Sequence, residues 1–206
     1  MKRFYNSCKV KKLFFKALSL METKQVFVFF LICFIVLASN VRTATANGPL
    51  YYLDIAIQLR KNKYYDRAHE VLNYGIRKYP NAHQLYLERG ALRYRNLRDF
   101  VGAINDYTVF LKLDKSNRQN HTKIFLNRGV CLYLIGQYRL SIKSFTHSIQ
   151  LNPKYSKPYL WRAKAYGKLG LINKAMKDLN KVSKISPKYN RAINDLRNQI
   201  YLNKSY

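Results

Sequence analysis

From residue 49 onward the chain alternates apolar helical stretches with short polar turns, and two such stretches make up each of several similar units. Residues 122–155 align with residues 156–189 at an offset of 34, which places Phe125 over Tyr159. The closing segments match best, because Leu-Asn-Pro-Lys-Tyr ends the first of these units and Ile-Ser-Pro-Lys-Tyr ends the second. A period of this length predicts pairs of helices that stack on one another.

Each unit carries an aromatic residue in its first helix, a small residue one turn later, a second small residue in the next helix and, in three units, a closing proline. In chain order these residues are Tyr52, Ala56, Ala68 and Pro80; Tyr86, Gly90 and Ala103; Phe125, Gly129, Ser141 and Pro153; and Tyr159, Ala163, Ala175 and Pro187. The pattern resembles the tetratricopeptide repeat family over about 140 residues.

The resemblance implies an all-α fold, a right-handed α-solenoid of four helix pairs at 49–82, 83–117, 122–155 and 156–189. The repeat domain would then cover residues 49–189. Beyond it, Ile193, Leu196 and Ile200 follow helical spacing among polar residues. We therefore expect residues 190–206 to form a capping helix and tail, because a solenoid must cover its last apolar surface.

The second unit departs from the pattern of the others. It has one extra residue near Asn96, Arg98 stands where the turn usually has glycine, and Lys115 replaces the closing proline. Four more residues, 118–121, precede the third unit. A looser junction or a lengthened loop is expected between the second and third units.

Residues 1–46 have the layout of an export signal. A basic segment precedes an uncharged apolar stretch at 26–38, and Ala44 and Ala46 supply the small residues of a cleavage site before Asn47. A spanning helix needs about 20 apolar residues, so the short stretch favours a cleaved signal peptide. The alternative is a signal-anchor that holds residues 26–41 in the membrane with a cytoplasmic N-terminus, and Met21 is an alternative start to Met1. In both cases the lysines before the stretch predict a repeat domain that is exported, periplasmic or secreted.

Charge narrows the class of partner. The chain has 38 Lys plus Arg against 10 Asp plus Glu, and from Asn47 onward 30 basic and nine acidic residues leave a net charge of +21. Such a positive surface attracts acidic proteins, anionic polymers and lipid head groups. In the alternative interpretation, the basic surface is only solvated and has no dedicated partner. Cys131 is the one cysteine beyond the predicted leader, so no disulfide framework or cysteine metal site is expected there.

In this family first-helix residues form most of the inner, concave face, and the resemblance places a partner-binding face on twelve positions. These are Leu53, Ile57, Leu87, Tyr94, Lys123, Leu126, Val130, Tyr133, Lys157, Leu160, Lys164 and Lys168. Leucines would form an apolar floor, with lysines gathered toward the third and fourth units. Such a groove suits an acidic or amphipathic peptide or helix. In the alternative interpretation, the leucines and tyrosines only pack against neighbouring units.

An arginine precedes the small residue of the first helix in units two to four, and an aspartate lies in the second helix of units two and four. These residues are Arg89, Arg128, Arg162, Asp106 and Asp178. We expect ion pairs that tie helices together within or between units. Ser144 stands at the acidic position of unit three, so Arg128 is the arginine expected to lack such a partner.

The sequence favours a binding protein over an enzyme. Its four histidines match no metal spacing, and no nucleotide-binding glycine loop or nucleophile elbow is found. We expect no catalytic residues, no cofactor and no metal. The function predicted is a non-enzymatic protein-interaction scaffold outside the cytoplasm that binds a peptide or helix of a protein partner. The alternative is a binder of anionic polymers or membrane surfaces, and export disfavours nucleic acid.

Overall fold

The computed structural model describes residues 48–116 and 121–202, so the predicted leader at 1–46 and its cleavage site lie outside the described residues. The helices of the described part are α3 (Pro49–Lys61), α4 (Tyr65–Lys78), α5 (His83–Leu92), η1 (Arg93–Leu97), α6 (Phe100–Leu113), α7 (His121–Leu134), α8 (Tyr138–Leu151), α9 (Ser156–Lys168), α10 (Ile172–Ile185), η3 (Pro187–Tyr189) and α11 (Asn190–Leu202). No β-strand occurs within these ranges.

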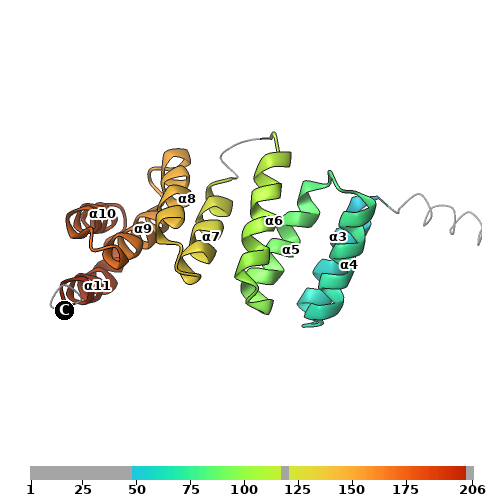
Figure 1. Cartoon of the computed structure of the whole chain (residues 1–206), viewed down its shortest axis with the longest axis horizontal. Helices are drawn as coiled ribbons and strands as arrows, with labels where there is room; N and C mark the ends of the chain where they lie inside the picture. The colour runs from blue at the N-terminus through green and yellow to red at the C-terminus, as the bar shows by residue number, and fades with distance from the viewer. Residues whose placement is uncertain (1–47, 117–120, 203–206) are drawn as a thin grey trace, which may run out of the picture. The chain divides into compact units, whose positions relative to one another are not determined.

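The α-helices form pairs that follow one another in chain order, from α3 and α4 in cyan to α9 and α10 in dark orange (Figure 1). Within each pair the two helices pack together, and the second helix of one pair contacts the first helix of the next. This arrangement confirms the predicted α-solenoid of four helix pairs. Helix α11 packs on α9 and α10 and buries Ile193, Leu196 and Ile200, which confirms the expected capping helix.

The extra residue of the second unit is absorbed in the backbone at the end of its first helix. The last turn there widens into the π-helical segment η1, and Arg98 then adopts a left-handed conformation with φ 58°. Gly136 and Gly170 occupy the matching turns of the next two units with φ 79° and 69°. Arg98 thus stands where glycine would avoid the steric cost of a side chain.

The small residue of each first helix matches the bulk of one side chain in the second helix. A Cβ added to Gly129 would lie 2.5 Å from the ring of Phe145, and one added to Gly90 would lie 3.1 Å from the ring of Tyr107. In the fourth unit an alanine, Ala163, shares its cluster with a leucine at the same place. Glycine is therefore used where the facing residue is aromatic. At Gly129 the atoms nearest to an added Cβ all belong to the Phe145 ring, not to the small residue Ser141 of the same helix.

Candidate functional site

The twelve residues of the predicted concave face differ in burial, and each is exposed, partly buried or buried. Lys123, Lys157 and Lys168 are exposed, and most of the others are partly buried. Leu53, Leu87, Tyr94 and Leu160 each pack against the core cluster of their own part of the stack. The face therefore combines exposed cations with apolar side chains that also serve the core.

Two residues of the predicted face are buried in the interior. Leu126 is 6% exposed and Val130 is 4% exposed, and both pack with Phe145 and Ala165. Their burial leaves almost no side-chain surface for a partner to contact. For these two residues the structure agrees with the alternative interpretation, in which apolar first-helix residues pack between units.

Three of the twelve residues converge on one cavity. Tyr133 of α7 and Lys164 and Lys168 of α9 line a space of about 210 Å³ together with Gly167 and with three residues of α11, Leu196, Gln199 and Ile200. Gly167 lets α11 approach α9 closely beside this space, because an added Cβ would lie 2.7 Å from Ile200. The cavity thus has a phenol, two ammonium groups and an apolar wall, which can hold an amphipathic side chain.

Trp161 supports this cavity although sequence analysis did not include it. Its ring meets the Tyr133 ring edge to face at a centroid distance of 5.4 Å, and the Lys164 ammonium lies 4.7 Å from the indole centroid. Such contacts hold both Tyr133 and Lys164 in place. Sequence analysis also missed the residues of α11, which reading that helix as the first helix of a fifth unit would have found.

The arginines of units two to four connect successive second helices. Arg162 donates to both carboxylate oxygens of Asp178 on α10 at 2.8 Å and to Thr146 Oγ1 on α8 at 2.9 Å. Arg89 likewise binds Asp106 on α6, at 2.6 Å, and Asn73 on α4, at 2.7 Å. The predicted ion pairs are confirmed, and each of these two arginines ties its own unit to the one before it.

Arg128 makes the same bridge with hydroxyl groups alone. Its Nη1 donates to Ser144 Oγ and its Nε to Thr108 Oγ1, both at 2.9 Å. Within the described residues no ion pair joins Arg128 to a carboxylate, and the two hydroxyl groups engage its guanidinium instead. Burial lowers the pKa of Arg128, whereas in Arg162 the opposing effect of burial is outweighed by Asp178 and the pKa is raised. The third unit therefore holds a half-buried cation without a counter-charge.

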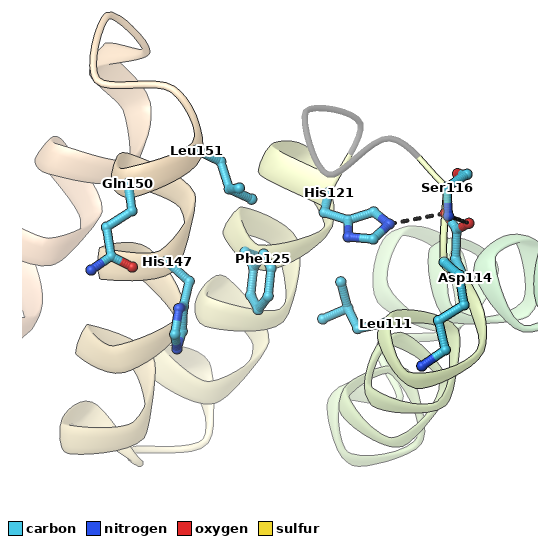
Figure 2. Close-up of a pocket in the computed structure, with 9 residues that line it drawn as sticks. Leu111, Asp114, Ser116, His121, Phe125, His147, Gln150 and Leu151 are labelled. Atoms are coloured by element: carbon cyan, nitrogen blue, oxygen red, sulfur yellow. Dashed lines mark hydrogen bonds and ion pairs between the residues drawn. The ribbon is translucent and has the colours of Figure 1, made fainter.

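A pocket of about 510 Å³ lies between the second and third units, over α7 (Figure 2). Phe125 of α7 faces His147 of α8, with ring centroids 5.1 Å apart, and His121 points away from them toward Asp114. His121 Nε2 lies 2.9 Å from Asp114 Oδ2, and the Ser116 backbone N–H donates to Oδ1 at 2.9 Å. Hydrogen bonds from Ser116 and then His121 hold the pKa of Asp114 well below its usual range, although burial opposes them. The Asp114 carboxylate thus contacts both Ser116, after the last helix of the second unit, and His121, at the start of the third.

Comparison with known proteins identifies the repeats. A family model described as tetratricopeptide repeat matches residues 122–155 and 156–189. These two units, 68 of the 206 residues, match the tetratricopeptide repeat family. They coincide with the pairs α7–α8 and α9–α10. These pairs supply most of the residues that line the cavity, and they are the two units whose sequences match each other best.

Two curated relatives share sequence with this chain. DnaJ homolog subfamily C member 7 of Mus musculus is 32% identical over 76 residues, which are 37% of this chain and 15% of that protein. Tetratricopeptide repeat protein 16 of Homo sapiens is 28% identical over 151 residues, 72% of this chain and 17% of that protein. The chain thus spans about a sixth of the length of these relatives.

Solved structures share the fold. A crystal structure of MamA has a TM-score of 0.66 at 20% identity and covers 73% of this chain and 85% of its own. The structure of YrrB, described as a tetratricopeptide repeat protein with an unusual peptide-binding site, has a TM-score of 0.68 at 14% identity and covers 81% and 83%. At these identities the likeness shows the fold, a solenoid of stacked helix pairs, and nothing more specific.

Across residues 48–116 and 121–202, no three His, Cys, Asp or Glu side chains gather in a way that could hold a metal ion. Cys131 is buried, and burial raises the pKa of its thiol to about 12, so it is not a thiolate nucleophile near neutral pH. None of the helices described here is long and apolar enough to span a membrane.

Proposed function

We propose that this protein is a non-enzymatic scaffold that binds a peptide or helix of a protein partner on its predicted concave face. The observation that carries the proposal is the cavity at Tyr133, Lys164 and Lys168, which joins ammonium groups to the apolar side chains of Leu196 and Ile200. A partner segment with one apolar residue next to an acidic one matches these groups. YrrB, which shares the fold, is described as having a peptide-binding site, and this supports a peptide as the ligand.

The single tryptophan of the chain provides a direct assay. Trp161 contacts Tyr133 and Lys164 at the cavity, so its fluorescence should change when a ligand binds there. Peptides would be selected from a displayed library by their binding to the full chain. Each selected peptide would then be titrated into the protein while the tryptophan emission is measured. We expect acidic peptides with an apolar anchor, and binding weakened about tenfold or more by Lys164→Glu with Lys168→Glu.

A matched pair of exposed lysines serves as the control. Lys61→Glu with Lys154→Glu makes the same change in net charge away from the cavity. Binding by this pair within about twofold of wild type would support a local site. Equal weakening by both pairs, or peptide binding without any change in Trp161 emission, would place the ligand elsewhere.

We further propose that the repeat domain acts outside the cytoplasm, after cleavage before Asn47 or while anchored by residues 26–41. The proposal rests on the basic segment, the apolar stretch at 26–38 and the small residues Ala44 and Ala46. N-terminal sequencing of the protein from its host should give Asn47 as the first residue. An intact N-terminus in the membrane fraction would indicate the anchored form, and an intact N-terminus in the soluble cytoplasmic fraction would refute export.

The alternative function is binding to anionic polymers or membrane surfaces through net charge. A net charge of +21 from Asn47 onward favours it. Salt separates the two functions, because affinity for a polyanion such as nucleic acid falls by about 0.9 log units per log unit of salt for each phosphate contacted. Peptide binding in the cavity should retain most of its affinity between 50 and about 300 mM salt, since part of it comes from apolar contact.

A further inference from the structure

A second groove lies on the side of α9 opposite the predicted concave face. Tyr159, Arg162 and Tyr166 of α9 form its floor, and α10 forms its wall, around a space of about 690 Å³. At 3.6 residues per turn these floor residues point roughly opposite to Leu160, Lys164 and Lys168. Ligands in this groove and in the concave cavity would therefore not compete for the same side chains.

The wall of this groove is a row of lysines. Lys174, Lys177, Lys181 and Lys184 all line it and are all exposed, and we call it the lysine groove. Their spacing of three, four and three residues puts them within about 80° of one another around α10. The row extends along the helix for about 15 Å, with successive positions about 4.5 to 6 Å apart.

Nothing in the described part of the chain neutralises this row. No carboxylate there lies within 4 Å of any of the four ammonium groups. The one acidic residue that lines the groove, Asp178, has both oxygens bound to Arg162. Helices α9 and α10 with their turn carry eight basic residues against that single aspartate. A row of like charges held side by side is stabilised by a partner with matching negative charges.

The spacing and the floor together favour a protein helix as that partner. Carboxylates at i, i+3, i+7 and i+10 of a helix repeat the spacing of the lysines, so two such helices can align charge to charge. Single-stranded nucleic acid is usually bound by open aromatic rings on which bases stack. Tyr159 is only 7% exposed here, and Arg162 lies between it and Tyr166, with its Cζ 5.7 and 5.8 Å from the two ring centroids.

We propose that the lysine groove binds an acidic amphipathic helix of a protein partner, independently of the concave cavity. The glutamates or aspartates of that helix would pair with the four lysines of α10. Its apolar residues would lie against Tyr166, which is partly exposed at the floor of the groove. The chain would then have two binding faces on the same helix pair.

The test uses two labelled helical peptides of identical composition, measured by fluorescence anisotropy with the full chain. One carries glutamates at i, i+3, i+7 and i+10, and the other spreads the same glutamates around the helix. We expect the first to bind about tenfold more tightly, and Lys177→Gln with Lys181→Gln to remove most of that difference. Trp161 emission should not change, because the indole is on the other side of α9.

Matched variants and probes make each outcome decisive. Lys61→Gln with Lys154→Gln removes two exposed charges elsewhere and should change binding by no more than about twofold. Equal affinity of the two peptides, or equal loss in the two lysine pairs, would overturn the proposal in favour of nonspecific charge. Tighter, Lys177- and Lys181-dependent binding of an oligothymidylate would make the groove a polyanion site and also overturn it. Failure here leaves the concave cavity to be judged by its own tryptophan assay.

Discussion

Replacing Ser144 with aspartate should stabilise the protein, because it would give Arg128 the partner that Arg89 and Arg162 already have. Ser144 Oγ accepts from Arg128 Nη1 at 2.9 Å, whereas Asp178 accepts from Arg162 twice at 2.8 Å. The two positions are 34 residues apart and equivalent in the repeat. Ser144→Asp thus copies an arrangement that the same backbone holds one unit later.

The gain can be bounded from the geometry. Unit charges about 4 Å apart at an effective dielectric constant near 20 attract by about 4 kcal/mol, and a hydrogen bond to a charged group contributes about 1.5 to 3 kcal/mol net. Desolvating a carboxylate at a site where Ser144 is fully buried offsets part of this attraction. A net gain of about 1 to 2 kcal/mol would raise the Tm by roughly 3 to 6 °C in a protein of this size.

The assay is denaturant unfolding followed by far-UV circular dichroism at pH 7 and pH 3. The new carboxylate would have a folded pKa below its unfolded value of about 3.9, so its stabilisation is present above that value and is lost as the pH falls through the folded pKa. Ser144→Asn supplies a side chain of equal size without the charge. A double-mutant cycle with Arg128→Gln measures the pairing itself. If Ser144→Asp lowers the midpoint as Ser144→Asn does, or if its effect survives Arg128→Gln, the reasoning is wrong.

Three further changes test other parts of the fold. Gly129→Ala should destabilise by about 1 to 3 kcal/mol in thermal unfolding, because the new Cβ would lie 2.5 Å from the Phe145 ring; an unchanged Tm would contradict the close crossing. Lys63→Gly should stabilise by up to about 1 kcal/mol in urea, since Lys63 has φ 65°, and a loss would show that its side chain matters more. Asp114→Asn should lower the urea midpoint at pH 7, and this loss should shrink only as the pH falls below about 3.9 and on through the lowered pKa of Asp114, because the folded protein keeps this carboxylate charged well below its usual range; a difference independent of pH would argue against the charge.

The helix pairs could be predicted from the sequence because repeated small residues and a fixed period determine them locally. The arginine–aspartate pairs were predictable for the same reason, since Arg162 and Asp178 occupy fixed positions of the unit. The exposure of single side chains was not. Leu126 occupies the same position of the unit as Leu160, yet Leu126 is buried and Leu160 is partly exposed. Exposure depends on the size of neighbours from other helices, here Phe145 and Ala165, and the period does not encode that size.

The lysines of the lysine groove can be recognised in the sequence, but only the structure shows that no acidic side chain among the described residues neutralises them. Lysines at 174, 177, 181 and 184 can be read as one helical face, yet a basic face alone is usually solvated. The structure adds that Asp178 is 5% exposed and bound by Arg162, so the acid nearest the row along the chain cannot neutralise it. The bridge that ties α8 to α10 therefore also leaves the positive field of α10 uncompensated. A residue pair that contributes to stability thus shapes the surface offered to a partner, and Asp178→Asn should weaken the stack while making that surface still more positive.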